Sequence, residues 1–332
     1  MSAAGGRRDV YGLELAGEDD AFAAREATCA ATGVEVVAPG LATARGVDAD
    51  RLRTLAYTHR ASRLLGRSEA SVDAARAVVE AAGIDRTGTV AVRARDVRGT
   101  AGVDTRRAER ALGTALVDRG FAVDLDDPDH ELRACFAGDA CLVGWLVAES
   151  VRDYGDRRPT DRPFFQPGSM APLDARAFAN LAGARPGATI LDPMCGTGGT
   201  LIEAGLAGAR PVGVDAQRKM VRGARENCRA YLDGDAHLLR GDATDLPLAD
   251  DAVDGVVFDA PYGRQSKIAR HTLADLVAGA LAEAARVAPR AVVVADRSWA
   301  TAADAAGWSV EGSFRRRVHR SLTRHVHLLR RD

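Results

Sequence analysis

The feature that most constrains the fold is an alternation of short apolar segments and helical segments through residues 189–295. Short runs rich in Val, Leu and Ile, separated by longer amphipathic stretches, predict strands joined by helices, and therefore a parallel, doubly wound α/β sheet. The expected strands are 189–192, 212–215, 237–240, 253–259 and 291–295, and the expected helices are 200–209, 217–232, 271–288 and a short one near 299–306. Two later strands, 308–318 and 322–330, are expected to pair as an antiparallel hairpin, which would make the sheet mixed.

The front half has a different, α+β pattern. We expect helices at 19–31, 48–66, 70–82 and 104–119, and strands near 10–15, 34–37, 41–45, 89–95, 121–125, 131–136 and 140–148. A connector, residues 157–172, separates the two halves and contains Pro159, Pro163, Pro167 and Pro172. Because proline fixes φ and favours extended geometry in the preceding residue, this segment is expected to be stiff.

Net charge alone argues against a nucleic-acid partner, because the chain carries a formal charge of −1 and phosphate contacts need Arg and Lys. The charge is unevenly distributed, however. Residues 1–156 carry 20 basic and 26 acidic side chains, whereas residues 157–332 carry 25 basic and 20 acidic ones. A basic second half is compatible with a polyanionic partner, since local field rather than total charge attracts phosphate.

The composition also predicts where the chain works. Five scattered cysteines without C-x-x-C or zinc-site spacing indicate reduced thiols and no metal site. The sequence contains neither a signal-peptide pattern nor an apolar run long enough to span a membrane. We therefore expect a soluble, cytoplasmic protein with no membrane partner.

A glycine-rich turn follows the first of the predicted parallel strands. It reads Asp192-Pro-Met-Cys-Gly-Thr-Gly-Gly-Thr200 and leads into a helix. Glycines at such a turn let the backbone approach a ligand closely. The turn is not a dinucleotide fingerprint, because Leu201 stands where the third glycine of G-x-G-x-x-G belongs, and it lacks the Gly-Lys pair of a P-loop.

Acidic residues also end the next strands. Asp215 can bind the two hydroxyls of a ribose, and Asp242 can meet the amino group of an adenine. The fourth strand ends in Asp259-Ala-Pro-Tyr-Gly263. Asp259 and the carbonyl of Ala260, held by Pro261, can accept both hydrogens of an exocyclic amine, and Tyr262 can stack on the base. The four strand ends together predict a ligand site.

These motifs resemble the class I S-adenosylmethionine-dependent methyltransferases that methylate amines, whose fourth motif is (D/N)-P-P-Y; here Ala260 replaces the first proline. Across residues 85 to 332 the chain resembles, more closely, the archaeal tRNA (guanine(10)-N(2))-methyltransferase family. The matching segments are Glu109–Gly113, Val123–Pro128, Arg162–Met170, the Asp192 turn, Asp259–Arg264 and Val318–Arg324.

The resemblance implies an organisation and a set of roles. It implies a ferredoxin-like domain at 1–65, a THUMP RNA-binding domain at 66–156, a linker at 157–172 and a Rossmann-like methyltransferase domain at 173–332. The cofactor would be S-adenosylmethionine, and the partners would be tRNA and, for some relatives, a small zinc-binding activator, with the chain otherwise monomeric. The expected catalytic residues are Asp259, Ala260, Pro261 and Tyr262. The expected cofactor-binding residues are Pro167, Ser169, Met170, Asp192, Cys195, Gly196, Thr197, Gly198, Gly199, Asp215, Asp242 and Ala243.

Clusters of arginine suggest where RNA would bind. One lies in residues 93–110 and another in residues 313–331, which contain seven arginines and no acidic residue. The expected RNA-binding residues are Arg93, Arg95, Arg106, Arg107, Arg264, Arg316, Arg320 and Arg324. Two alternatives remain: the same chemistry on another tRNA or rRNA guanine, and a non-catalytic RNA-binding protein. One or two methyl groups per guanine are equally compatible with the sequence.

Overall fold

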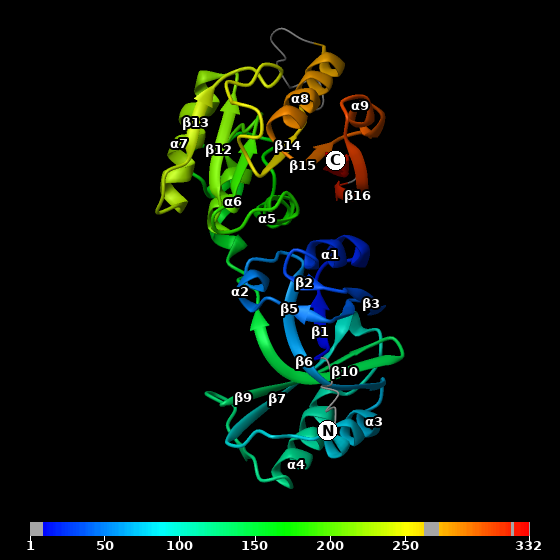
Figure 1. Ribbon diagram of the computed structural model, residues 1–332. Coiled ribbons are helices and arrows are strands. Elements are labelled where there is room, and N and C mark those ends of the chain that lie inside the picture. Colours follow the sequence, from blue (N-terminus) through cyan, green and yellow to red (C-terminus); the bar gives the residue numbers. More distant parts are fainter. Residues whose placement is uncertain (1–8, 262–271, 320–321, 332) are drawn as a thin grey trace, which may run out of the picture. The chain divides into compact units, whose positions relative to one another are not determined.

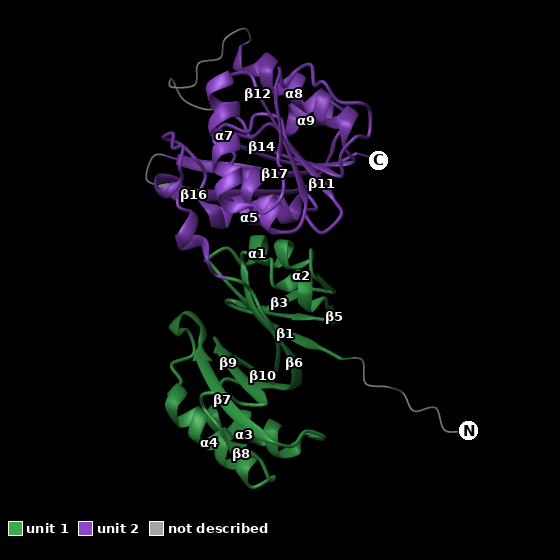
Figure 2. Ribbon diagram, turned by 90° about the vertical axis from the view of Figure 1, so that its left-hand side faces the viewer, with its two compact units in different colours: residues 1–151 green, residues 152–332 purple. Residues whose placement is uncertain are grey.

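The computed structural model describes residues 9–261, 272–319 and 322–331 (Figure 1). The chain forms two compact units, residues 1–151 and residues 152–332, which Figure 2 distinguishes by colour. The second unit begins before the proline-rich connector, so the connector belongs to it. The finer division of the front half at residue 65 stays a prediction.

Unit 1 is built on one eight-stranded sheet in the order β3-β4-β1-β6-β10-β9-β7-β8. Its strands are β1 (Tyr11–Leu15), β3 (Glu35–Ala38), β4 (Leu41–Ala44), β6 (Thr58–Glu69), β7 (Thr89–Asp96), β8 (Ala122–Val123), β9 (His130–Ala137) and β10 (Ala140–Glu149), and β2 (Ala31–Thr32) pairs separately with β5 (Gly46–Val47). Its helices are α1 (Asp20–Ala27), α2 (Ala49–Leu52), α3 (Val72–Ala81) and α4 (Thr105–Val117), with a 3-10 turn at Val97–Gly99. Helices α3 and α4 bury Val79 and Leu112 against Val92, Leu132 and other residues on one face of this sheet.

The predicted helix at 48–66 is wrong. Only α2 is helical there, and the chain from Thr58 onward forms the twelve-residue strand β6. Its stretch Arg60-Ala-Ser-Arg-Leu-Leu65 has good helix formers, but intrinsic helix preferences are small. They are outweighed because β6 pairs along its length with β1 on one side and β10 on the other. The other predicted elements of this half are present, with shorter bounds at several ends.

Unit 2 contains the doubly wound sheet that the sequence predicts. Its strands are β11 (Thr189–Asp192), β12 (Arg210–Asp215), β13 (His237–Arg240), β14 (Gly255–Asp259), β15 (Arg290–Ala295), β16 (Ser309–His319) and β17 (Leu322–Arg330), in the order β13-β12-β11-β14-β15-β17-β16. Its helices are α5 (Pro172–Leu181), α6 (Gly199–Leu206), α7 (Arg218–Tyr231), α8 (Leu273–Val287) and α9 (Ala300–Ala305), with 3-10 turns at Tyr154–Arg157 and Pro159–Asp161. Strands β11 to β15 are parallel, and the β16–β17 hairpin is antiparallel. The mixed sheet is thus confirmed.

Two apolar clusters hold this sheet in place. One joins α6 and α7 through Leu201 and Val221, and the other packs α8 against Phe258 of β14. Trp308, which is buried, donates from Nε1 to the carbonyl of Leu281, 3.0 Å away. Figure 1 shows α7 and α8 on opposite sides of the strands. Such two-sided cover is typical of parallel sheets and leaves the strand ends for ligands. In the part of the chain that the structure describes, no helix is both long and apolar enough to cross a membrane.

Candidate active site

The four strand ends singled out from the sequence lie side by side. Strands β13, β12, β11 and β14 are consecutive in the sheet and parallel. Asp192, Asp215 and Asp259 are the last residues of three of them, and Asp242 follows the fourth. The strand order reverses between β11 and β14, which is the switch point where open α/β sheets bind ligands. The predicted alignment of these carboxylates is therefore present in the structure.

The glycine-rich turn is held as a tight loop at this edge. The amide of Met194 donates to Asp192 Oδ1 at 3.1 Å, and that of Cys195 donates to the carbonyl of Val214 at 3.0 Å. Gly196 and Gly198 have φ of 50° and 79°, a region that other residues rarely adopt. No heavy atom lies within 4 Å of the position that a Cβ would take at Gly196. The loop thus exposes backbone to an open space next to the first turn of α6.

Asp215 ties the loop to the neighbouring strand. Its Oδ2 accepts a hydrogen bond from the Gly196 amide at 3.0 Å, and its Oδ1 accepts one from the Gln217 amide at 2.8 Å. Burial raises the pKa of this carboxyl above its ordinary value, and these two hydrogen bonds oppose the rise. Asp215 therefore presents a largely preoriented carboxylate at the end of β12.

Asp192 is the most perturbed acid of the site. Its side chain is 3% exposed. Burial, and to a smaller degree the negative charges of Asp215 and Asp259, raise its pKa to about 8. A buried carboxyl of this kind binds a proton at neutral pH unless a cation approaches it. Asp192 is consequently suited to receive a positively charged ligand.

The remaining two strand ends differ in their surroundings. Asp242 Oδ1 accepts hydrogen bonds from the amide and the hydroxyl of Thr244, at 3.0 and 2.8 Å. After Asp259, the Ala260 amide donates to the Val294 carbonyl at 2.7 Å, which fixes the backbone where the chain leaves β14. Ala260 is buried and Pro261 half-buried. Tyr262 and Arg264, predicted for base stacking and RNA contact, lie outside the described residues.

The C-terminal hairpin contributes residues that sequence reasoning placed elsewhere. Arg324 is 4% exposed, and its Nη2 lies 3.4 Å from Asp259 Oδ2. Its Nη1 lies 3.8 Å from Asp174 Oδ2 on α5, and Arg316 Nη2 donates to Asp174 Oδ1 at 3.1 Å. Both arginines, predicted as RNA ligands, thus face acidic side chains within the unit. Arg315 and Arg317, at the alternate positions of β16, are exposed instead; Arg320 lies outside the described residues.

The connector packs on the glycine-rich loop. Ser169 Oγ lies 3.1 Å from Thr197 Oγ1. The buried Asn227 of α7 bonds the amide and carbonyl of Phe164, both at 2.8 Å, and donates to the Thr197 carbonyl at 2.9 Å. Asn227 could not be predicted from the sequence, since an asparagine in the middle of a helix carries no pattern of its own. Phe165 is 42% exposed, unlike Phe164, whose ring lies against Gly223 of α7.

Several predicted cofactor-binding residues are buried as packing residues. Cys195 lies in the apolar cluster with Leu201, and burial holds the pKa of its thiol well above the ordinary value. Ala243 belongs to the cluster around Phe258, and Met170 is 6% exposed. Pro167 is exposed, and Thr197 and Gly199 are buried at the start of α6. The buried residues of this set can therefore offer a ligand their backbone groups rather than their side chains.

The predicted RNA-binding arginines of unit 1 do not form one patch. Arg93 and Arg95 project from β7 on the face opposite the α3–α4 core, as the alternation of strand side chains requires. Arg93 Nη2 donates to the Leu125 carbonyl at 2.7 Å, and Arg95 Nη1 lies 3.5 Å from Glu14 Oε2. Arg106 and Arg107 are exposed in the first turn of α4 instead. Within the described residues, no group of three His, Cys, Asp or Glu could hold a metal ion.

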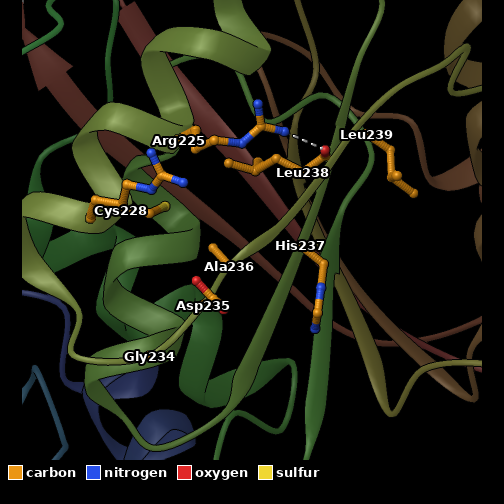
Figure 3. Close-up of a pocket in the computed structure, with 9 residues that line it drawn as sticks. Arg225, Cys228, Gly234, Asp235, Ala236, His237, Leu238 and Leu239 are labelled. Atoms are coloured by element: carbon orange, nitrogen blue, oxygen red, sulfur yellow. Dashed lines mark hydrogen bonds between the residues drawn. The ribbon is translucent and has the colours of Figure 1, made fainter.

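A separate cavity of about 280 Å³ lies between α7 and the amino end of β13. It is lined by Arg225, Arg229, His237 and neighbouring residues (Figure 3). Arg225 Nη2 donates to the Leu238 carbonyl at 3.0 Å, as the dashed line in the figure shows. Because the four carboxylates lie at the other end of the strands, this cavity is distinct from the candidate site.

Comparison with known proteins identifies the family. Residues 159–325 match the RMKL-like, methyltransferase domain family. The chain is 38% identical over 290 residues to the tRNA (guanine(10)-N2)-dimethyltransferase of Methanothermobacter thermautotrophicus, covering 84% of each chain. It belongs to the tRNA (guanine(10)-N(2))-methyltransferase family. A second member, from Pyrococcus abyssi, is 32% identical over 248 residues, which are 73% of this chain and 74% of the relative.

The fold agrees with this membership. The crystal structure of TrmN from Thermus thermophilus superposes with a TM-score of 0.51 at 22% identity, over 97% of this chain and 100% of that one. The Rossmann-like α/β fold predicted from the sequence is thereby confirmed. As a member of the tRNA (guanine(10)-N(2))-methyltransferase family the chain is a methyltransferase, and S-adenosylmethionine is the methyl donor that this membership implies.

Proposed function

We propose that this chain transfers methyl groups from S-adenosylmethionine to the exocyclic N2 amine of guanosine 10 in tRNA, giving N2-methyl- and then N2,N2-dimethylguanosine. The observation that carries the proposal is the position of Asp259, at the end of β14 directly beside the Asp192 loop. This position supports the proposal, because a carboxylate there would lie next to the methyl donor and could accept a proton. The guanine 10 position and the second methyl rest on the 38% identity to a tRNA (guanine(10)-N2)-dimethyltransferase.

The residues present fit S-adenosylmethionine. The donor is a cation, and Asp192 is a buried carboxyl whose raised pKa a nearby positive charge would lower. The loop from Asp192 to Gly199 would hold the methionine moiety, with the open space at Gly196 facing it. Asp215 would bind the ribose hydroxyls and Asp242 the adenine amine. Ser169 and Thr197 join the connector to this loop and would close its outer side.

The target amine needs orientation more than activation. Its lone pair is delocalised into the guanine ring, so the amine must be held with the lone pair directed at the methyl group. Asp259 and the Ala260 carbonyl would accept its two hydrogens, and the hydrogen bond from the Ala260 amide to Val294 keeps that carbonyl in place. Holding reactants in the reactive geometry can account for much of a rate enhancement.

The transfer has a simple balance of bonds. S-adenosylmethionine, held by the Asp192 loop and Asp215, would supply an electrophilic methyl group for N2, and its sulfur would keep the electron pair of the bond that breaks. The methylated nitrogen becomes acidic, and Asp259 would accept the proton that it loses. Asp259 thus acts on the nucleophile before the transfer and on the proton after it.

The decisive test is transfer of labelled methyl groups to an unmodified tRNA transcript. We expect incorporation of up to two methyl groups per transcript and none when guanine 10 is replaced by adenine. Nucleoside analysis should show N2-methylguanosine first and the dimethylated product later. Incorporation that persists in the replaced transcript would refute position 10, whereas incorporation into neither would refute the activity.

The affinity for S-adenosylmethionine should depend on pH through Asp192. Its pKa of about 8 in the free protein means that binding the cation at pH 7 releases a proton. The dissociation constant should therefore fall as pH rises from 6 to 8, by up to about tenfold per unit, and level off above 8. Calorimetry in buffers of different ionisation enthalpy should detect the proton. Asp192→Asn should bind more weakly and with little pH dependence; an equally steep dependence in this variant would contradict the assignment.

The remaining proposals concern the compartment, the activator protein and the RNA contacts. Because the proposed substrate is tRNA, we place the reaction in the cytoplasm, with the chain monomeric apart from its substrate and any activator. Transfer assays with and without a small zinc-binding activator protein would show whether one is needed. Arg93, Arg95, Arg106 and Arg107 remain the proposed RNA contacts of unit 1, and the exposed Arg315 and Arg317 are better placed than Arg316 and Arg324 to meet phosphate in unit 2.

A further inference from the structure

We propose that Arg324 is a positioning residue for catalysis, which orients the Asp259 carboxylate and keeps it ionised. This inference rests on the proposed role of Asp259 as acceptor of the amine proton. Arg324 Nη2 lies 3.4 Å from Asp259 Oδ2, and the side chain of Arg324 is 5% exposed. Asp259 itself is partly open, at 22% side-chain exposure. The carboxylate thus faces a buried guanidinium, while the side chain as a whole keeps a partly exposed surface.

The hairpin register explains why Arg324 points into the site. Arg316 of β16 and Arg324 of β17 are directly opposite each other, so their side chains leave the same face of the hairpin. Two like charges in these positions repel each other. Asp174, in the first turn of α5, lies between them, 3.1 Å from Arg316 and 3.8 Å from Arg324. The two arginines are therefore stable side by side only with acidic partners. Asp174 is the first of these partners and Asp259 is the second.

Charges from every neighbouring element bear on Asp259. Asp192 from β11 is close enough that the two carboxylates raise each other's cost of ionisation. Asp174 from α5 adds a third negative charge nearby, and Arg324 and Arg316 supply the opposing positive charge. Without Arg324, Asp259 would lie among carboxylates and would bind a proton more readily. A protonated Asp259 could not accept the proton of the amine.

The shape of arginine suits this task. Its planar fork offers separate donors to two acceptors, and here Nη1 faces Asp174 while Nη2 faces Asp259. The two contacts fix the plane of the guanidinium and with it the direction of the Asp259 carboxylate. A lysine would supply the charge but only a single point of contact. Arg324 also differs from Arg317 in exposure. Arg324 is buried, whereas Arg317 is exposed on β16 and can meet phosphate.

The test compares Arg324→Gln with Arg317→Gln as a matched control on the same hairpin. For Arg324→Gln we expect kcat to fall about 10- to 100-fold at pH 7, and the acidic limb of the pH–kcat profile to move up by about one unit. The dissociation constant for tRNA should change less than about twofold, because a buried side chain makes no phosphate contact. Arg324→Lys should restore the pH limb but only part of kcat.

In the control, tRNA binding should weaken and become less dependent on salt, whereas the acidic limb of the pH–kcat profile should stay where it is in the wild type. If Arg324→Gln weakens tRNA binding while leaving kcat and its pH profile unchanged, Arg324 is a phosphate contact and the inference is wrong. If Arg324→Gln does not fold, the double variant Arg324→Gln with Asp174→Asn removes opposite charges together. Its acidic limb should still move up, but by less than about one unit, because Asp174 also disfavours ionisation of Asp259. An unmoved limb refutes the inference.

A second measurement separates this inference from the proposed function. Carboxyl NMR of the full chain can follow the titration of Asp259 without any turnover. We expect its pKa to rise in Arg324→Gln and to stay in place in Arg317→Gln. If the wild type transfers no methyl group to tRNA, the proposed function fails and this titration still decides whether Arg324 sets the ionisation of Asp259. An unchanged titration refutes the role of Arg324.

Discussion

Replacing Asp259 with alanine should lower kcat for methyl transfer by about 10³-fold, the loss expected when an oriented polar group of an active site is removed. The substitution removes both the hydrogen-bond acceptor for the amine and the acceptor for its proton. Binding of tRNA and of S-adenosylmethionine should change less than about threefold, because tRNA is held mainly through distant phosphates. Single-turnover methyl transfer and separate binding titrations would measure the two effects.

A pair of further variants sharpens this test. Asp259→Asn keeps an oxygen that can orient the amine but cannot take the proton, so its kcat should lie between those of wild type and alanine. Asp254→Ala is the matched control: it lies at the other end of β14, where Asp254 Oδ2 accepts from the Thr189 amide at 2.8 Å. That variant should retain wild-type kcat. Normal turnover in Asp259→Ala would exclude Asp259 as the catalytic acceptor.

The placement of the four carboxylates could be predicted from the sequence because it depends on topology alone. In a parallel sheet every strand ends at the same edge, so a residue that ends a strand is located once the strand is recognised. Apolar strands such as β12, which lies between α6 and α7, are easily recognised because the helices on either side have a 3.6-residue periodicity. The positions of Asp192, Asp215 and Asp259 could therefore be predicted without knowledge of side-chain contacts.

The hairpin arginines show where this reasoning fails. Because side chains alternate along a strand, Arg316 must point to the opposite face from Arg315 and Arg317. The sequence does not show which of the two faces is turned toward the protein. That choice depends on the register of β16 against β17 and on α5, which brings Asp174 to the inner face. Asp174 is far from the hairpin in sequence. Long-range partners of this kind decide whether an arginine binds phosphate or an internal carboxylate.

Strand β6 fails for a related reason. Its composition favours a helix, and only pairing with β1 and β10, at distant places in the chain, makes a strand of it. In unit 2, by contrast, local preference and tertiary structure agree, so every predicted element was found. The difference follows from topology. In the parallel sheet most neighbouring strands are also consecutive along the chain, whereas β6 lies between two strands that come from opposite ends of unit 1.

Glu203→Gln should produce the largest loss of stability in unit 2, about 3–5 kcal/mol, the usual cost of breaking a buried ion pair by removing one partner. Glu203 of α6 is fully buried, and its Oε1 accepts from Arg157 Nε at 2.9 Å while its Oε2 lies 2.9 Å from Arg176 Nη2. Both arginine side chains are 5% exposed. Glutamine keeps the shape but leaves these positive charges without the carboxylate that balances them.

The effect should also reach the cofactor site, because Arg157 is the first residue of the connector and Glu203 belongs to the helix that starts in the glycine-rich loop. Urea unfolding of the full chain with the additional substitution Trp145→Phe, followed by tryptophan fluorescence, would report on unit 2, because the remaining tryptophans, Trp299 and Trp308, both lie in that unit. Asp250→Asn is the matched control in the same unit, since the Asp250–Arg286 pair is equally short, at 2.8 Å, with an exposed Asp250, and should contribute less than about 0.5 kcal/mol. Equal unfolding midpoints for the two variants would mean that the buried carboxylate does not stabilise the contact between the connector segment and α6.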